Sequence, residues 1–436
     1  FVFRAFFAFK PTCQLVSHGQ PVLAMQKPRE RHAHRKVKGT TPVDSSVDER
    51  SKRADANSWW PAGFWKGPAS SLVLGLAVCW MTWTSLGLDG QSRARSQEAD
   101  GNDVVKVLDT AEDAHGHLVA AVSNEELGVN FLTFGSSIIG AQYVQAEYKD
   151  QAAFTGFAVQ ESILFVNRSL RHVLQLGLGA GVVASYLRSH RIQVDVVELS
   201  DAVLYLAEKR FEFNSCCQEG QAALGACDPG GPSATACRAR QGSSKLSEAR
   251  SFLFDQEATR YDVVISDVFN GSNPGHMHSV EVFARLKDHW LIPGGILVLN
   301  FVGFHRGPGS QLSFDVATTL RAVFQVARCY RDQGLEEEPD MAANLVCFAS
   351  DEDFRFNVPQ SGDFSNPIPL SSFWVMQEFQ AWEVLKPLSR TAGHIIQDSD
   401  NELLHAGAQS QIERQLRAHA RNLIPEHVWK ALGIVT

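Results

Sequence analysis

From about Val104 the chain changes from polar sequence to short apolar or alternating runs, separated by polar and glycine-containing turns. Alternation with a period of two residues, interrupted by turn residues, is the pattern of half-buried strands. Residues 100–150 are therefore predicted to form a small antiparallel β domain. The runs that predict it are VVKVLD, HLVAAVS, VNFLTFG and SIIGAQYVQAEY.

A different pattern begins after this domain, in which apolar strands alternate with helix-like segments. FTGFAVQESILFVN has helical spacing, and residues 172–201 predict a strand, a glycine turn, a helix and a strand that ends near Glu198. YDVVISD is a predicted strand ending at Asp267, followed by a helix and the strand of PGGILVLNFVGF. FDVATTLRAVFQVARCYRD is predicted as a helix and ANLVCFAS as a strand.

Strands that alternate with helices predict the α/β class, with a Rossmann-like doubly wound sheet of the methyltransferase type. We expect this cofactor-binding domain to occupy residues 151–350. Residues 351–436 are less regular and are predicted to form a C-terminal extension with a terminal helix around Gln409–Leu423.

The N-terminal part has two patterns of its own. Residues 1–66 are mostly polar and basic and are predicted to be disordered. Residues 67–88 carry no charge over a length that spans a bilayer, and Trp59, Trp60 and Trp65 lie just before them. We expect a single-pass membrane anchor here, with organelle targeting by the basic arm as the alternative.

Charge is unevenly spread along the chain. Residues 1–66 hold 12 Lys and Arg against 5 Asp and Glu, whereas the rest holds 28 against 43. An acidic catalytic region is a poor match for a phosphate backbone, so no nucleic-acid partner is expected.

The cysteines near residue 227 lack metal-ligand spacing, so no metal site is expected. Their surroundings, residues 214–245, are predicted to be a flexible insertion.

The glycine turn carries the clearest functional signal. Gly177, Gly179 and Gly181 follow the first parallel strand, and Glu198 ends the second strand about 20 residues further on. Such glycines allow close approach of a ligand, and the carboxylate can accept both hydroxyls of a ribose. The G-x-G-x-G spacing is typical of sites for S-adenosylmethionine or its decarboxylated form, which have no pyrophosphate.

Taken together, several segments resemble the spermidine/spermine synthase family of polyamine aminopropyltransferases, and especially its membrane-anchored, uncharacterised branch. The resemblance covers about Val104 to Asp332, and it implies an amine substrate, a methyltransferase-like fold and a homodimer. The segments that carry it are FGSSIIGAQY, AVQES, LGLGAG, VVELSD, SEARSFL and YDVVISDVFNGSNPGHM.

The resemblance also assigns roles to residues at both ends of the site. Glu198 would hold the ribose of the cofactor, Glu248 the adenine amino group, and the glycine loop the methionine part. Asp267 matches the first acidic residue of the family's catalytic stretch and would contact both cofactor and amine. The substrate would lie against Gln142, Gln160 and Glu161.

Two departures from the family concern residues of the reaction itself. The family places an aspartate base three residues after the position of Asp267, and this chain has Asn270, which cannot accept a proton at physiological pH. A family tyrosine near the amine is matched by Phe157. We therefore expect weak or absent aminopropyl transfer, restored by Asn270→Asp, unless Asp267, Glu161 or His276 supplies the base.

Three functions stay open from the sequence. Aminopropyl transfer and methyl transfer both fit the glycine loop, and the carboxylate of the cofactor would distinguish them. A non-catalytic, membrane-tethered scaffold that retains the fold is the third. His276 and His278 lie in the loop after Asp267, where loop histidines are mostly bystanders and a neutral imidazole can act as a base.

Overall fold

The structure is a computed structural model, in which the described residues are 104–149, 151–215, 241–257, 259–333, 341–360, 363, 371–386, 393–400 and 405–434. The basic region 1–66, the apolar span 67–88 and most of the insertion 214–245 lie outside these ranges. Within them, no helix combines the length and the hydropathy needed to cross a membrane. The membrane anchor therefore stays a prediction.

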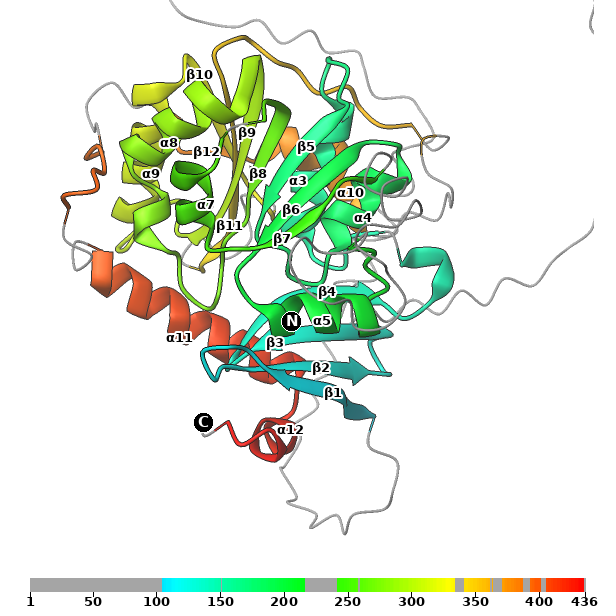
Figure 1. The fold of residues 1–436 in the computed structure, drawn as a ribbon. Helices are drawn as coiled ribbons and strands as arrows, with labels where there is room; N and C mark the ends of the chain where they lie inside the picture. Colours follow the sequence, from blue (N-terminus) through cyan, green and yellow to red (C-terminus); the bar gives the residue numbers. More distant parts are fainter. Residues whose placement is uncertain are drawn as a thin grey trace, which may run out of the picture. The chain divides into compact units, whose positions relative to one another are not determined.

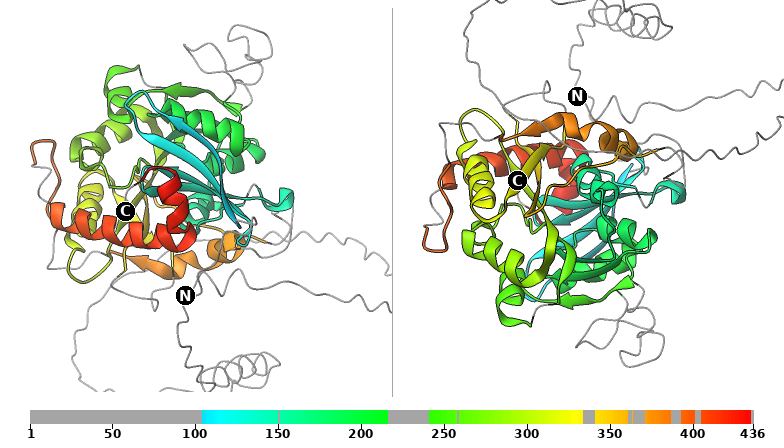
Figure 2. Two further views of the ribbon diagram at one scale, coloured as in Figure 1. Left: turned by 90° about the horizontal axis from the view of Figure 1, so that it is seen from below. Right: turned by 90° about the horizontal axis from the view of Figure 1, so that it is seen from above.

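The predicted β domain is a four-stranded antiparallel sheet in the order β1-β2-β3-β4. One face packs against Leu206 of α5 and residues of the glycine loop, and the other against Leu423 of α11 and Trp429 of α12. Figures 1 and 2 show this sheet between those helices. The strands are β1 (Val105–Glu112), β2 (Leu118–Asn124), β3 (Val129–Phe134) and β4 (Ser137–Tyr143).

An eight-stranded sheet in the order β12-β10-β11-β9-β8-β5-β6-β7 forms the rest of the core. The neighbours from β7 to β9 pair in parallel, whereas β11 lies antiparallel between β9 and β10. The strands are β5 (His172–Leu176), β6 (Gln193–Glu198), β7 (Ser244–Leu246), β8 (Tyr261–Ser266), β9 (Leu291–Gly303), β10 (Val326–Arg331), β11 (Ala343–Ser350) and β12 (Glu383–Val384).

Helices cover both faces of this sheet, which confirms the predicted α/β doubly wound class (Figure 1). One face packs against α7, α8 and α9, and the other mainly against α3, α4 and α10. The helices are α3 (Thr155–Glu161), α4 (Val182–Ser189), α5 (Asp201–Arg210), α7 (Ala249–Asp255), α8 (Val280–Arg285), α9 (Gln311–Val323), α10 (Ser371–Glu378), α11 (Ala406–Leu423) and α12 (Glu426–Ala431).

The prediction of one helix through FDVATTLRAVFQVARCYRD is wrong in its second half. α9 ends at Val323, Phe324 is extended with φ −104° and ψ 146°, and β10 follows. The run VARCYR alternates and pairs antiparallel with β11, where Cys329 lies opposite Cys347 and forms a disulfide with it. Strand pairing within the sheet therefore overrides the helical continuation.

The order of the strands defines where a ligand can bind. The chain passes from β5 outward to β6 and β7, and returns to add β8 on the other side of β5. Ligands of open α/β sheets bind at such a switch point, beyond the carboxyl ends of the two diverging strands. Here those ends lead into the glycine loop and into Asp267.

Candidate active site

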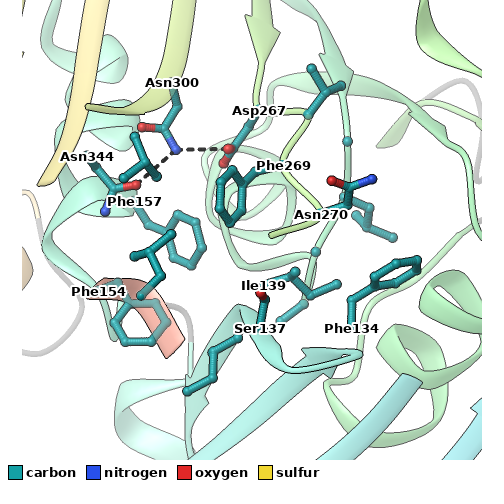
Figure 3. Close-up of a pocket in the computed structure, with 18 of the residues that line it drawn as sticks. Phe134, Ser137, Ile139, Phe154, Phe157, Asp267, Phe269, Asn270, Asn300 and Asn344 are labelled. Atoms are coloured by element: carbon teal, nitrogen blue, oxygen red, sulfur yellow. Dashed lines mark hydrogen bonds between the residues drawn. The ribbon is translucent and has the colours of Figure 1, made fainter. Parts of the chain in front are cut away.

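A cavity of about 580 Å³ lies at this switch point, between the two sheets and α11. Its walls come from the glycine loop, the ends of β6, β8, β9 and β10, the start of α3, strand β4 and one face of α11. Figure 3 shows part of this cavity, with aromatic rings from the β domain, from α3 and from the loop after β8.

The glycine loop fits its surroundings only because it lacks side chains. All three glycines have positive φ, and a Cβ on Gly177 would lie 2.2 Å from the Asp267 carbonyl oxygen. A Cβ on Gly179 would lie 2.6 Å from the Ile139 carbonyl oxygen of β4. Gly140, which the sequence did not single out, makes the matching approach from β4, because its Cβ would lie 2.5 Å from the Ala180 nitrogen.

Glu198 ends β6 beside this loop and is 8% exposed. Its Oε2 accepts a hydrogen bond from the Leu178 backbone N–H at 2.8 Å, and its Oε1 accepts one from Ser200 N–H at 2.9 Å. Burial raises the pKa of Glu198, although hydrogen bonds from the backbone N–H groups of Ser200, Leu178 and Leu199 oppose the shift. The carboxylate lines the cavity and also fixes the conformation of the loop.

Glu248 lines the cavity and is the N-cap of α7, accepting hydrogen bonds from the backbone N–H groups of Arg250 and Ser251. Burial opposes ionisation, but these donors hold the pKa of Glu248 below its usual value. His276 Nε2 lies 3.7 Å from Glu248 Oε1. The two cavity carboxylates of this end are thus anchored by backbone rather than by cations.

Asp267 follows β8 and faces the same cavity. Its Oδ1 accepts from Asn300 Nδ2 and its Oδ2 from Gln160 Nε2, each at 2.8 Å. Burial raises its pKa, while the two amide donors oppose the shift. Figure 3 shows the bond from Asn300.

The three residues predicted to contact substrate are not among the cavity-lining residues. Gln142 instead donates to the carbonyl oxygens of Phe211 and Lys149, at 3.0 and 3.3 Å. Gln160 and Glu161 are fully buried in α3, and Gln160 reaches the cavity only through its bond to Asp267. Direct substrate contacts of these residues stay predictions.

The remaining candidates are divided between the cavity wall and the core. Asn270, Phe157 and His276 line the cavity, and in the view of Figure 3 Asn270 lies to the right of both Asp267 and Phe269. His278 is 1% exposed and packs against Phe301, and burial lowers its pKa to about 4. His278 is therefore a neutral core residue.

Sequence reasoning missed a polar network at the other end of the cavity. Asn300 Nδ2 also donates to Asn344 Oδ1 at 3.4 Å, and Asn344 Nδ2 donates to Asp332 Oδ2 at 2.9 Å. Thr155 Oγ1 of α3 donates to the same Asp332 oxygen at 3.2 Å. Two buried carboxyl groups, Asp267 and Asp332, are thus joined through two carboxamides.

A polar residue within an otherwise apolar strand, as at Asn300 in LVLNFVG, was the available signal for this network. The wall formed by α11 had a weaker signal, because it comes from the C-terminal extension. Gln415 Oε1 accepts from the Ala342 N–H at 2.7 Å and holds α11 against the start of β11. The α11 residues in the wall are Gln415, Leu416, His419, Ala420, Asn422 and Leu423.

The charge of the cavity has one sign. Its described lining residues include four carboxylic acids and neither lysine nor arginine. The described ranges contain no group of His, Cys, Asp or Glu arranged to hold a metal ion, and Cys216, Cys217, Cys227 and Cys237 lie outside them. The wall is therefore suited to a cationic or neutral ligand.

No family model matches the sequence, and no curated protein matches it. The structure is similar to a probable spermidine synthase from Corynebacterium glutamicum, with 16% identity, a TM-score of 0.47, and coverage of 68% of this chain and 98% of that chain. Spermidine synthase from Thermotoga maritima has 13% identity and a TM-score of 0.40, with coverage of 76% of this chain and 88% of that chain. Human methyltransferase-like protein 13 has 17% identity and a TM-score of 0.32, with coverage of 58% of this chain and 96% of that chain. Such values carry no inference about activity.

Proposed function

We propose that this protein transfers a group from an adenosyl sulfonium compound, S-adenosylmethionine or its decarboxylated form, to an amine. One observation carries the proposal. A single cavity joins two anchored carboxylates, Glu198 and Glu248, to a second compartment that contains two buried carboxyl groups, Asp267 and Asp332. A nucleoside fits the first end, and an N–H-bearing acceptor fits the second.

The chemistry of the first end fits an adenosyl group. The missing side chains of Gly177 and Gly179 let the loop pack closely against Asp267 and β4, and the loop itself lines the cavity, so a ligand can lie against it. Glu198 retains lone pairs for ribose hydroxyls, and Glu248 retains them for an adenine amino group. Both carboxylates line the cavity.

The second end fits a nitrogen acceptor because it contains unused hydrogen-bond acceptors. Asp332 Oδ1 and Asn300 Oδ1 are buried, and no described residue donates to either of them. A buried acceptor without a donor is unfavourable by about 1–3 kcal/mol, so a ligand that supplies N–H groups is favoured there. Phe154, Phe157 and Phe269 add apolar and cation-attracting surface around it.

The residues would divide the work as follows. A bound sulfonium supplies a carbon that is activated toward attack by a nucleophile. The acidic wall attracts the cationic acceptor, and the aromatic rings exclude water around the reacting atoms. Asp267, fixed by Asn300 and Gln160, holds its charge beside the loop where the sulfonium would lie and stabilises the cation.

Aminopropyl transfer is the finer proposal, because a cavity lined by carboxylates and by no described lysine or arginine suits a cofactor without a carboxylate. Methyl transfer is the second candidate. Asn270 favours it, since this position lacks the carboxylate that aminopropyl transfer uses in the family the chain resembles. A scaffold without activity remains the third outcome.

The test is calorimetric titration of the full chain with S-adenosylmethionine and with its decarboxylated form, followed by product analysis with 1,4-diaminobutane. Preference for the decarboxylated compound and formation of an aminopropylated amine would support the finer proposal. Binding and methylation with S-adenosylmethionine would select the second. If neither compound binds, the transferase proposal is wrong and the scaffold is supported.

Membrane attachment through residues 67–88 and homodimer formation are separate proposals. Partition of the full chain into the detergent phase would support the anchor, and partition into the aqueous phase would contradict it. Analytical ultracentrifugation in detergent tests the dimer.

A further inference from the structure

Transfer to an amine needs a proton acceptor, because an ammonium ion has no lone pair with which to attack carbon. Asn270 has a carboxamide, which cannot take this proton. Each carboxylate oxygen of Asp267 accepts an amide hydrogen bond that stabilises its charged form and weakens it as a base, and Glu161 is fully buried and does not line the cavity. None of these three residues is therefore a well-placed proton acceptor. The remaining candidate from the sequence is the exposed His276.

Asp332 has the geometry that the others lack. It follows β10, lines the cavity and is 3% exposed. Oδ2 is held by two donors, Asn344 Nδ2 and Thr155 Oγ1, and these fix the plane and position of the carboxyl group. Oδ1 receives no hydrogen bond from the described residues and is the oxygen left to take a proton.

The surrounding chain is built to keep this arrangement. A Cβ on Gly156 would lie 2.8 Å from Asn344 Cγ, so the missing side chain makes room for the asparagine over the first turn of α3. The Asp332 backbone N–H donates to the Asn344 carbonyl oxygen at 3.1 Å, which joins the same two residues a second time. Asn344 is thus positioned from both its main chain and its side chain.

We propose that Asp332 is the base of this reaction and accepts the proton of the acceptor ammonium at Oδ1. The inference rests on the proposed amine transferase. The ammonium gives its proton to the carboxylate and becomes a neutral amine. The nitrogen lone pair then forms the C–N bond, while the C–S bond breaks and its electron pair stays on sulfur as a neutral thioether. The product is a substituted ammonium, and the proton on Asp332 leaves to solvent when the product is released.

The electrostatic surroundings support this role. Burial raises the pKa of Asp332, and the Asn344 amide, the Arg331 charge and the Thr155 hydroxyl oppose the shift. Of the described charged side chains, Arg331 of the same strand is the one that acts on it, while Asp267 is connected only through the two carboxamides. A raised pKa makes the carboxylate a stronger base at neutral pH.

The test compares the full-length wild type with Asp332→Asn, using decarboxylated S-adenosylmethionine and 1,4-diaminobutane, and with S-adenosylmethionine in parallel. We expect the variant to bind the sulfonium with unchanged affinity but to lose roughly 10²–10⁴-fold in single-turnover rate, as general-base catalysis predicts. The wild-type rate should rise with pH through the pKa of Asp332, and the variant should lack this limb. Asp332→Glu, which keeps a carboxylate, should recover part of the rate.

Asp315→Asn is the matched control, because Asp315 is 1% exposed and does not line the cavity. It should keep the pH limb. Infrared difference spectra of the wild type between about pH 5 and about pH 8 should show a carboxyl proton signal that Asp332→Asn removes and Asp315→Asn retains. Unchanged sulfonium affinity of Asp332→Asn shows that the variant is folded, so the loss of the signal can be assigned to Asp332.

The outcomes separate the two proposals. Failure to bind either sulfonium overturns the transferase itself. Sulfonium binding without amine-dependent turnover of the wild type overturns transfer to an amine, whereas wild-type turnover with a pH limb that persists in Asp332→Asn overturns the base assignment alone. A gain of about 10²-fold or more in Asn270→Asp would place the missing base at residue 270 and also overturn it.

Discussion

The backbone N–H of Leu178 donates to Glu198 Oε2 at 2.8 Å, so the carboxylate that faces the cavity also holds the glycine loop. Ser200 N–H occupies the other oxygen at 2.9 Å. Glu198 therefore acts on a ligand in two ways, through its remaining lone pairs and through the shape of the loop.

Glu198→Ala should weaken binding of the adenosyl sulfonium by roughly 1.5–3 kcal/mol, the contribution of a hydrogen bond to a charged group. This is about a tenfold to a hundredfold increase in Kd, measured by calorimetric titration. Glu198→Gln should lose nearly as much, because an amide can accept from only one of the two backbone donors at a time. An unchanged Kd in both variants would remove Glu198 from the site. Glu125→Ala, at an exposed position away from the cavity, is the control.

Gly140→Ala should separate β4 from the glycine loop, because the new Cβ would lie 2.5 Å from the Ala180 nitrogen, a backbone atom that cannot move aside alone. Overpacking of this kind lowers the free energy of unfolding by about 1–3 kcal/mol, measured by urea denaturation. Gly407→Ala near the start of α11 is the control, because its Cβ meets nothing within 4 Å and no loss of stability is expected. Equal stability of the two variants would contradict the close contact.

Asp267 gives a prediction in the pH dependence of stability. Burial raises its pKa in the folded state. Its contribution to stability is therefore complete below the unfolded pKa and is lost as the pH rises through the folded pKa. Asn does not titrate, so the free energy of unfolding of Asp267→Asn minus that of the wild type should increase as the pH rises above about 4. Parallel denaturant curves at several pH values measure this difference, and a flat difference would show that the pKa is unshifted.

Asn273 fixes the loop after β8 to β9. Its Nδ2 donates to the Val302 carbonyl oxygen at 2.7 Å, and its Oδ1 accepts from Val302 N–H at 2.9 Å. Asn273→Ala leaves both buried backbone groups unpaired and should cost about 1–3 kcal/mol of unfolding free energy. Asn273→Asp keeps the acceptor but places a buried carboxylate oxygen opposite the Val302 carbonyl oxygen, so at neutral pH it should lose at least as much. A smaller loss in thermal unfolding for Asn273→Asp would contradict this.

The sequence predicted the half of the site whose signals are local. The glycine loop and Glu198 lie within one strand–turn–helix–strand unit, and Asp267 ends a clear apolar strand, so spacing alone places them near one another. The network around Asp332 could not be predicted in this way. It forms because β11 inserts antiparallel between β9 and β10, which brings the start of one strand beside the ends of two others.

Dependence on distant residues also explains two incorrect or incomplete expectations. Continuous apolar spacing after Val316 does not reveal that the chain leaves the helix at Phe324, because the strand that follows is stabilised by pairing with distant residues. Gln142 lies on β4 next to the cavity, but its side-chain amide donates a hydrogen bond to the Phe211 carbonyl oxygen. Which face a polar side chain takes depends on partners that a single sequence does not show.

α11 and the glycine loop line the same cavity but come from separate parts of the sequence, so each can change independently by mutation. The loop that would receive the nucleoside and the helix that adds one wall lie far apart in the sequence, and Gln415 holds the helix against the start of β11 through Ala342. Under the proposed function, substitutions in α11 would change which acceptor fits while leaving the cofactor end intact. A lineage with that activity would then acquire new substrates through changes in α11 alone.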